Sequence, residues 1–303
     1  MRPDLARPKA ASAANGERLA LRVDLRCEQL GGVAKAPGGA GVKIEMFNVG
    51  WLTAAAGVWR RGDDFARTIR FPVPAYVIEV GTHRVLIDTG LSRGAATDAR
   101  SHYKRPEVTD PFDLDLDLDI AEQVKVSTIT QVVLTHLHFD HAGGLARLPR
   151  SVPVVVQRRE WDAGHNPGAV NRNGYFPIDY DEPAREVILI DGDHDLLGDG
   201  SVTLMLTPGH TPGHQSVRIG SDLVLGGDVA YFASGLDDHR FPVYGDDYAE
   251  QARSATRLRA LRDAGVRVLP GHDPDVLRPG PIALAEAGSP SSPVAQRGVD
   301  ASE

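Results

Sequence analysis

Short apolar runs, each bounded by glycine, proline or aspartate, recur along most of the chain. Runs rich in valine, isoleucine and leucine with turn residues at both ends are typical of buried strands. Strands are therefore predicted over residues 42–47, 74–80, 84–88, 129–134, 152–156, 187–190, 202–206, 216–219, 223–225 and 266–269. Helices are predicted over residues 119–126, 158–161 and 248–264.

Two stretches between these elements lack a clear period. Residues 51–64 are predicted to be irregular, and the tryptophans Trp51 and Trp59 within them either cap the core or wall a substrate pocket. Residues 162–185 mix Gly, Asn, Pro and Asp with scattered aromatics, which predicts a long loop. Because long loops in compact domains are often functional, this one is expected to help form the pocket.

The two ends of the chain differ in composition from the rest. Residues 1–41 are rich in Ala, Gly, Pro and Arg, which predicts a loosely ordered extension with one short strand or helix over residues 19–25. Residues 42–278 are predicted to form a single catalytic domain. Residues 279–303 are predicted to be a flexible tail.

Composition narrows the class of protein. The 303 residues carry a formal net charge of −8, which argues against a nucleic-acid-binding surface. The single cysteine, Cys27, excludes an internal disulfide. No run is long and apolar enough to span a membrane, and the N-terminus lacks the apolar core of a signal peptide. We therefore expect a cytoplasmic protein, monomer or homodimer, with no nucleic-acid or membrane partner.

An alternating acidic segment runs from Asp113 to Asp119. It is not an EF-hand, because the central glycine and the closing glutamate of that loop are missing. Strict alternation predicts an extended segment with one solvated acidic face. At its end, Asp119 with Glu122 three residues later forms the pattern of a capping box that begins a helix.

The densest chemistry lies between Thr135 and Gly144, directly after a predicted buried strand. His136 and His138 are two positions apart in an extended segment, so their side chains point to the same side and can hold one metal ion together. Asp140 and His141 follow the bend and can face a second ion. Neutral imidazole and carboxylate suit zinc and other borderline divalent metals.

The same order of apolar strand, glycine or proline, and then histidine or aspartate occurs elsewhere in the chain. It places Asp88, His210, Asp228 and His272 after four further strands. Strand ends can converge at one edge of a sheet, and two metal ions need about seven protein ligands plus water. Asp88 either orients a metal-binding histidine or caps the next turn.

These motifs resemble the metallo-β-lactamase superfamily, with its His-x-His-x-Asp-His signature, and within it the N-acyl-homoserine lactonases. The segments that carry the resemblance are Thr135–Gly144, Thr207–Ser216, Asp228–Tyr231 and Pro270–Asp273. The resemblance implies the α/β class and an αβ/βα four-layer sandwich. It implies that one ion is held by His136, His138 and His210, the other by Asp140, His141 and His272, and that Asp228 bridges them.

The resemblance also implies roles for side chains near the metals. Tyr231 would donate a hydrogen bond to the substrate carbonyl or the developing oxyanion, although it could be an ordinary half-buried aromatic. Asp140 would carry a proton to the leaving group. Phe139 would pack on an acyl chain. His214 is expected to form only hydrogen bonds, and surface positions are expected for His83, His102, His165, His194 and His239.

The function that the resemblance implies is hydrolysis of a lactone, by attack of a hydroxide that bridges two divalent ions. Zinc is the first expectation, with iron, cobalt and manganese as alternatives. Another lactone or ester, such as a vitamin-derived lactone, remains open as the substrate. A thioester hydrolase like glyoxalase II is disfavoured, because the segment after His272 has the composition of a tail. A persulfide dioxygenase would hold a single iron, so metal analysis separates it.

Overall fold

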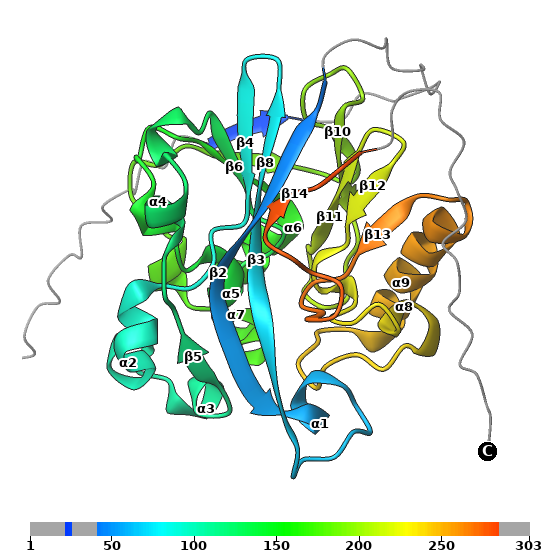
Figure 1. Cartoon of the computed structure of the whole chain (residues 1–303). Coiled ribbons are helices and arrows are strands. Elements are labelled where there is room, and N and C mark those ends of the chain that lie inside the picture. The colour runs from blue at the N-terminus through cyan, green and yellow to red at the C-terminus, as the bar shows by residue number, and fades with distance from the viewer. Residues whose placement is uncertain (1–21, 26–40, 285–303) are drawn as a thin grey trace, which may run out of the picture.

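Two β-sheets pack face to face at the centre of the molecule, and helices cover both outer faces (Figure 1). This arrangement is taken from a computed structural model that describes residues 22–25 and 41–284. The order of layers is helix, sheet, sheet, helix, which confirms the predicted four-layer sandwich of the α/β class.

The first sheet has nine strands in a mixed arrangement. Its parallel half runs β1-β8-β7-β6-β4, and β3, β2 and β14 continue it in antiparallel pairs, with β5 also paired to β2. The strands are β1 (Arg22–Leu25), β2 (Lys43–Ala55), β3 (Thr68–Val80), β4 (His83–Ile87), β5 (Asp113–Asp115), β6 (Gln131–Val133), β7 (Val154–Gln157), β8 (Val187–Ile190) and β14 (Gly280–Pro281).

The second sheet has five strands in the order β13-β12-β11-β10-β9. All of its pairs are antiparallel except the pair of β12 and β13. The strands are β9 (His194–Asp195), β10 (Val202–Leu206), β11 (Gln215–Ile219), β12 (Leu223–Leu225) and β13 (Arg267–Leu269).

The helices lie outside the two sheets. The α-helices are α1 (Ala56–Trp59), α2 (Arg93–Tyr103), α3 (Pro106–Thr109), α4 (Ile120–Gln123), α5 (Phe139–Ala142), α6 (Arg158–His165), α7 (Pro167–Asn173), α8 (Gly235–Asp238) and α9 (Tyr248–Asp263). Short 3-10 turns are η1 (Val126–Thr128), η2 (Leu145–Arg147), η3 (Pro177–Asp179) and η4 (Gly227–Val229).

Several strands of the first sheet are apolar at successive positions because both faces of this sheet are buried. Successive side chains of a strand point to opposite faces, so neighbouring residues enter different cores. Val133 and Val155 pack in the core between the sheets, while Val132 and Val154 pack in the core beneath the outer helices. On the far side, Leu258 of α9 packs in the core that covers the second sheet.

Two predictions about irregular segments were wrong, and one predicted helix is longer than expected. Residues 51–64 are not irregular throughout, because β2 continues to Ala55 and α1 follows directly. The helix predicted over residues 158–161 continues to His165 in α6. Residues 162–185 are not one long loop, since they contain the end of α6, α7 and η3. Asn166 caps α7 by accepting from the N–H groups of Gly168 and Ala169.

The predicted domain limits at residues 41 and 278 do not coincide with the edges of the first sheet. β1 lies within the segment predicted as an extension and pairs in parallel with β8. β14 lies within the segment predicted as a tail, and its Gly280 pairs with Met46 of β2. Pairing with a strand that is already in the sheet satisfies backbone groups at both edges. Residues 1–21, 26–40 and 285–303 of the predicted extension and tail lie outside the described residues.

The acidic segment behaves as predicted over most of its length. Asp113, Asp115 and Asp117 are exposed, and β5 pairs with β2. Asp119 is buried, and its side chain accepts from the N–H groups of Ala121 and Glu122 in a complete capping box at the start of α4. The capping box was therefore predicted correctly, although Asp119 itself is not part of the solvated face.

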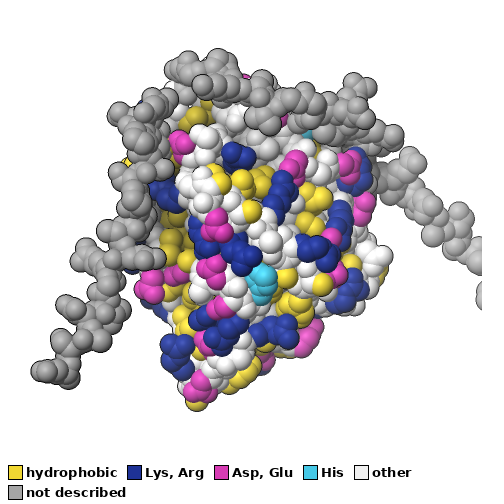
Figure 2. All heavy atoms as spheres, turned by 90° about the vertical axis from the view of Figure 1, so that its right-hand side faces the viewer, with side chains coloured by type: hydrophobic (Ala, Val, Ile, Leu, Met, Phe, Trp, Pro, Cys, Tyr) yellow, Lys and Arg dark blue, Asp and Glu magenta, His cyan; other side chains and the backbone are white. Residues whose placement is uncertain are grey.

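Opposite charges are interspersed on the face that carries α9 (Figure 2). Arg257 is paired with Asp193, and Arg262 lies 2.7 Å from a carboxylate oxygen of Asp237. Arg257 and Arg262 of this face therefore have acidic partners close by. Among the described residues, no helix is long and apolar enough to cross a membrane.

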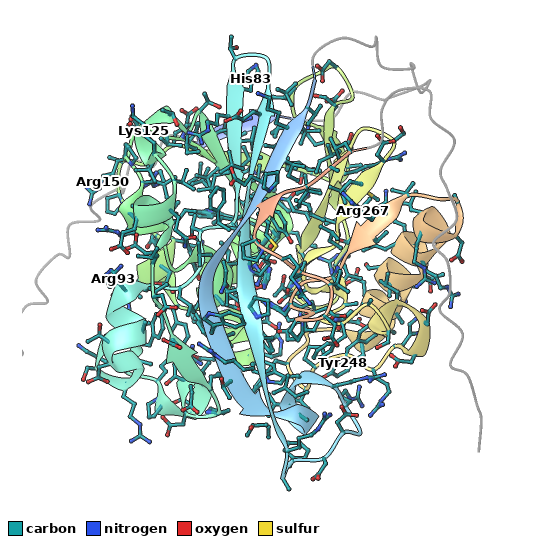
Figure 3. All side chains as sticks on the ribbon, in the orientation of Figure 1. His83, Arg93, Lys125, Arg150, Tyr248 and Arg267 are labelled. Carbon is teal, nitrogen blue, oxygen red and sulfur yellow. The ribbon has the colours of Figure 1, made fainter. Side chains whose placement is uncertain are left out.

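We predict that Arg185 is the most sensitive charged residue for stability. Its side chain is 1% exposed, and its guanidinium donates to the carbonyl oxygens of Leu145, Leu148, Pro149 and Val152. Arg185→Ala leaves these oxygens and Glu182 without their donor, so it should lower the free energy of unfolding by about 3–5 kcal/mol. Urea unfolding followed by circular dichroism measures this. Arg150→Ala, at an exposed position visible at the edge of Figure 3, should change it by less than about 0.5 kcal/mol.

Candidate metal centre

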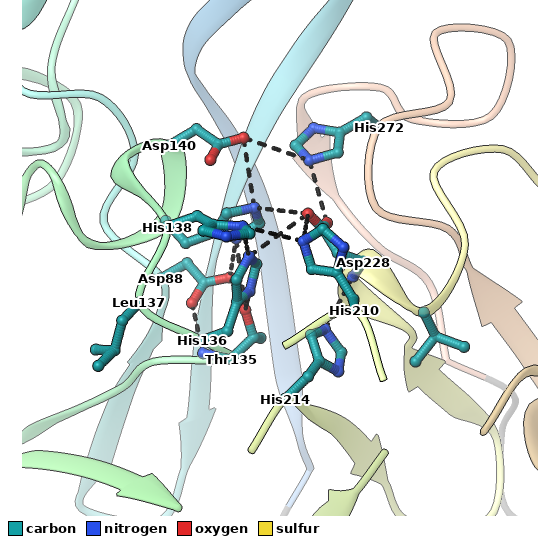
Figure 4. A network of polar contacts seen from close by, with 12 residues as sticks. Asp88, Thr135, His136, Leu137, His138, Asp140, His210, His214, Asp228 and His272 are labelled. Carbon is teal, nitrogen blue, oxygen red and sulfur yellow. Dashed lines mark hydrogen bonds and ion pairs between the residues drawn. The ribbon is translucent and has the colours of Figure 1, made fainter. Parts of the chain in front are cut away.

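The predicted ligands converge at one end of the two sheets, where five strands finish. Asp88 follows β4, the segment from His136 to His141 follows β6, and His210 follows β10. Asp228 follows β12 and His272 follows β13. Figure 4 shows these side chains pointing toward one another from segments that are far apart in the sequence. An open sheet offers functional groups at the carboxyl ends of its strands in this way.

Three histidines and Asp228 form the first cluster. Nδ1 of His138 lies 3.0 Å from Nε2 of His136 and 3.0 Å from Nε2 of His210. Oδ2 of Asp228 lies 3.6 Å from Nε2 of His136 and 3.2 Å from Nε2 of His210. All four atoms therefore face one common point.

Asp140, His141 and His272 form the second cluster. Oδ2 of Asp140 lies 3.6 Å from Nε2 of His141 and 3.6 Å from Nε2 of His272. Asp228 also reaches this cluster, because its Oδ2 lies 3.4 Å from His141 Nε2 and its Oδ1 lies 3.1 Å from His272 Nε2. The Asp228 carboxylate is thus shared by both clusters.

The unpaired atoms of this site fit bound cations. Atoms that bind a tetrahedral zinc ion at about 2.0–2.1 Å lie about 3.3–3.4 Å from one another, close to the spacing found here. Buried polar atoms normally have hydrogen-bond partners. Yet both carboxylate oxygens of Asp228, Nε2 of His141 and Nε2 of His272 are buried without one. A pair of divalent ions would satisfy all of them.

The protonation of the first cluster suits metal binding. Burial, together with neighbouring histidines, holds the pKa of His136 and of His138 well below the ordinary value. Both imidazoles are therefore neutral and keep a lone pair for a metal. No loss of a proton from these two rings is needed before an ion binds.

The second cluster is different in the metal-free protein. Burial lowers the pKa of His141, but the charges of Asp228, Asp140 and Asp88 outweigh it, so the pKa lies well above the ordinary value. The pKa of His272 is also raised, against the effect of burial, by Asp228 and Asp140. Protons on these histidines thus balance the buried carboxylates. Metal ions would replace these protons as the balancing charge.

Hydrogen bonds at the back of the ligands fix the ring orientations. Nδ1 of His141 lies 2.8 Å from Oδ2 of Asp88, and Nε2 of His138 lies 2.8 Å from the carbonyl oxygen of Asn173. Nδ1 of His272 lies 2.9 Å from the carbonyl oxygen of Pro72. Each ring thereby presents its other nitrogen to the centre. Two roles were considered for Asp88, orienting a metal-binding histidine and capping the next turn. Its contact with His141 supports the first role.

Two backbone positions make room for the centre. Asp88 has a φ of +58°, which lets its side chain accept from the N–H of Thr135 as well as face His141. Gly271 lies against Asp228, because a Cβ at this position would be 2.5 Å from Oδ1 of that carboxylate. Any side chain at position 271 would therefore push into the shared ligand.

Tyr231 lies beside the metal centre. Its ring centroid is 4.8 Å from that of His272 and 5.7 Å from that of His210. Burial raises the pKa of Tyr231 well above its ordinary value, and the charges of Asp228 and Asp140 raise it further. The phenol therefore keeps its proton and is available as a hydrogen-bond donor.

Phe139 lies in an aromatic cluster next to the ligands. Its ring centroid is 5.9 Å from that of Phe112, 6.0 Å from that of Tyr103 and 6.1 Å from that of Phe176. Trp59 joins the same apolar core and stacks on Phe112 at 5.0 Å. Trp59 is buried within this cluster, whereas Trp51 is half-buried beneath the guanidinium of Arg70.

The remaining histidines lie outside the two clusters. His214 is fully buried, and its Nε2 accepts from the N–H of Asp228, so it forms hydrogen bonds and is not in either ligand group, as predicted. Burial lowers the pKa of His214 to about 3. Figure 3 shows His83 at the tip of the hairpin formed by β3 and β4, far from the site. Exposed or half-buried positions are also found for His102, His165, His194 and His239.

One group close to the ligands was not predicted from the sequence. Glu160, in the first turn of α6, is completely buried, and it accepts from the N–H groups of Leu137 and Gly213 and from the phenol of Tyr175. Burial raises its pKa against the effect of these hydrogen bonds. No local pattern marks it, because its partners come from three other segments of the chain.

The family model described as the metallo-beta-lactamase superfamily matches residues 68–272 of this chain. The chain belongs to this superfamily. The match contains every one of the seven ligand-type residues in the two clusters. The segment that matches the family model therefore contains both ligand clusters of the candidate metal centre.

Curated relatives within this metallo-beta-lactamase superfamily carry lactonase names. The chain is 33% identical over 248 residues to N-acyl homoserine lactonase AttM of Rhizobium johnstonii, with 77% of this chain and 94% of the relative covered. It is 28% identical over 208 residues to an N-acyl homoserine lactonase of Bacillus thuringiensis, with 64% of this chain and 78% of the relative covered.

Solved structures of other proteins share the fold. An N-acyl homoserine lactone hydrolase with N-hexanoyl-L-homoserine at its catalytic metal centre matches with a TM-score of 0.68 and 24% identity, covering 77% of this chain and 94% of its own. AidC, described as a dizinc quorum-quenching lactonase, matches with a TM-score of 0.59 and 16% identity over 84% of this chain and 98% of its own.

Proposed function

We propose that this protein is a quorum-quenching lactonase that opens the ring of N-acyl-L-homoserine lactones with two bound divalent ions, zinc in the first place. The observation that carries the proposal is the pair of ligand clusters joined by Asp228, with the phenol of Tyr231 beside them. The relatives named N-acyl homoserine lactonase support the choice of substrate.

The ligands divide between the two ions as the clusters do. His136, His138 and His210 would hold one ion, and Asp140, His141 and His272 the other, with Asp228 binding both. Two bound divalent ions would supply Lewis acidity and would lower the pKa of water, so that hydroxide would be available near neutral pH. The reaction therefore needs no side chain as nucleophile.

Tyr231 and Asp140 are the side chains that we assign to proton and charge handling. The protonated phenol of Tyr231 donates a hydrogen bond to the substrate carbonyl oxygen as negative charge develops on it. Oδ2 of Asp140 faces His141 and His272, which leaves Oδ1 to take a proton from the attacking water and pass it to the leaving alkoxide.

Phe139 is the residue that we assign to the acyl group. It directly follows the ligand His138, and its ring belongs to the aromatic cluster with Phe112 and Phe176. An acyl chain buried against these rings would gain about 25 cal/mol for each Å² of apolar surface removed from water. We therefore expect longer acyl chains to bind more tightly until the apolar surface ends.

A panel of lactones tests the proposed substrate. N-acyl-L-homoserine lactones of graded chain length, a simple γ-lactone and a thioester are each incubated with the zinc-loaded protein, and proton release is followed in weak buffer. We expect the homoserine lactones to have the highest kcat/KM. A higher value for the simple lactone or for the thioester would instead support another esterase of the same superfamily.

Tyr231→Phe tests the role of the phenol. The change removes one oxygen and keeps the ring, so both ions should stay bound while kcat falls about 100-fold, since one donor to the oxyanion is lost. Metal content and steady-state kinetics are measured together. Tyr248→Phe removes the same atom from a tyrosine whose hydroxyl donates to Val243, and it should leave kcat within about twofold. Unchanged kinetics for Tyr231→Phe would remove this residue from the mechanism.

A further inference from the structure

Glu160 is a buried carboxylate placed between the two loops that carry the first cluster. Its side chain is 0% exposed, and it lies at the start of α6, directly behind the metal centre. A carboxylate in such a position is costly unless its oxygens are hydrogen-bonded. Both oxygens of Glu160 accept hydrogen bonds, so its side chain holds other segments of the chain in position.

The two backbone donors to Glu160 sit within the ligand motifs. Oε1 accepts from the N–H of Leu137 at 3.0 Å, and Leu137 lies between the ligands His136 and His138. Oε2 accepts from the N–H of Gly213 at 2.8 Å, in the loop that carries His210. A single side chain thus ties together both loops that supply histidines to the first cluster.

Gly213 allows this close approach. A Cβ at position 213 would lie 2.2 Å from the backbone nitrogen of Glu160, so only glycine fits against the start of α6. The loop carrying His210 is therefore packed on the same turn of helix that presents the carboxylate. Contact and hydrogen bond together fix the distance between this loop and α6.

Tyr175 adds a third connection to the same cluster. Its hydroxyl donates to Oε1 of Glu160 at 2.8 Å, and its ring centroid lies 5.5 Å from that of His138. Two residues earlier, the carbonyl oxygen of Asn173 lies 2.8 Å from Nε2 of His138. The C-terminal end of α7 and the residues after it therefore support His138 both directly and through the glutamate.

The second cluster has no such connection. In the described part of the chain, the Glu160 side chain accepts hydrogen bonds from Leu137, Gly213 and Tyr175, which all lie outside the second cluster. The ligands His141 and His272 are oriented instead by Asp88 and by the carbonyl oxygen of Pro72. The two halves of the centre thus have separate supports.

We propose that Glu160 is a positioning residue for one of the two ions, setting the spacing of His136, His138 and His210 and leaving the other ion to separate supports. This inference rests on the proposed two-ion centre. According to this proposal, the metal affinity of the first site depends on Glu160, which does not itself bind the ion. Partners of metal ligands in other proteins typically alter affinity or activity 10–100-fold when changed.

Glu160→Gln is the variant that tests the proposal. The amide has nearly the same shape, but its NH2 group must face one of the two backbone N–H donors, so one loop loses its anchor. The metal-free variant is titrated with zinc against a chelating dye, and with cobalt followed by its visible spectrum. We expect the affinity of the three-histidine site to fall about 10–100-fold together with a change in its cobalt bands, and the affinity of the other site to stay within about twofold.

The matched control is Glu186→Gln, the same exchange at a half-buried residue directly before β8. It should leave both zinc constants as in the unmodified protein. Tyr175→Phe removes only one donor to Glu160, and a measurable loss of affinity at the same site is expected, more than about twofold and up to about tenfold. This second variant decides the question if Glu160→Gln does not fold.

Two results would overturn the proposal. One is that Glu160→Gln, folded by circular dichroism, binds both ions as the unmodified protein does, or loses affinity for both equally. The other is that Tyr175→Phe leaves the zinc constants and the cobalt spectrum unchanged when Glu160→Gln cannot be obtained. Metal titration needs no substrate, so a protein that binds two ions but opens no lactone would refute the proposed function and not this inference.

Discussion

Asp228→Asn is expected to abolish hydrolysis and to remove most of the bound metal. Asp228 is the one side chain whose oxygens face histidines of both clusters, with Oδ2 at 3.2 Å from His210 Nε2 and Oδ1 at 3.1 Å from His272 Nε2. The amide keeps the volume but loses the negative charge and one of the two ligand oxygens. Because both sites lose a ligand at once, kcat/KM should fall at least about 1,000-fold.

Metal analysis and kinetics on the same sample check this result. The variant should hold well under one ion per chain after gel filtration, whereas the unmodified protein should hold two. Asp199→Asn, the same exchange at an exposed position, should change neither quantity. A folded Asp228→Asn protein that keeps two ions and full activity would show that this carboxylate does not bridge them.

Removal of metal is expected to lower the melting temperature by about 8–16 °C. A ligand that binds only the folded state, at a concentration 1,000 times its dissociation constant, stabilises that state by about 4 kcal/mol. Each kcal/mol of stability shifts the melting temperature of a chain of this size by about 2–4 °C. Without metal, Asp228 keeps two buried oxygens that have no hydrogen-bond partner, which is costly in the folded state.

Thermal unfolding with and without a chelator measures the effect. Addition of zinc should restore the higher melting temperature, and addition of magnesium should not, because imidazole-rich sites favour zinc over magnesium. The Asp228→Asn variant provides the control, since a chelator should hardly change its melting temperature. An equal shift in both proteins would mean that the chelator acts elsewhere.

The strands, and the grouping of ligand-type residues at their ends, were the features that the sequence predicted best. The apolar runs Val152–Val156 and Val202–Leu206 largely coincide with the strands β7 and β10. Such runs are recognisable because a strand that is buried on both faces needs apolar residues along most of its length. The ligand-type residues were found for a related reason. Each follows a strand, and the sheet brings the strand ends together regardless of their separation in the chain.

Helices with few buried residues were missed. α2 spans Arg93–Tyr103, but only Ala95 and Tyr103 are buried, and the backbone at Asp98 is not helical. Such a segment shows no apolar stripe of the kind that reveals a surface helix. α7 has a local cap at Asn166, but it is only seven residues long and also packs against α6, which the sequence does not reveal.

Glu160 could not be predicted for a similar reason. In the sequence it is one of several charged residues after β7, flanked by Arg159 and Trp161. Its role depends on three donors that reach it only after folding. Glu160 supports the metal centre by accepting from backbone N–H groups, and such contacts leave no recognisable pattern in the sequence. Asp88 was found because it is a carboxylate directly after a strand.

Zinc titration of the metal-free protein tests most directly whether paired cations perform the reaction. Chelated protein is mixed with increasing zinc, and proton release from N-hexanoyl-L-homoserine lactone is followed at each step. The rate should start near zero and rise until two equivalents of zinc per chain have been added, and then stay constant. Full activity without added metal, or a plateau at one equivalent, would contradict a centre built from two ions.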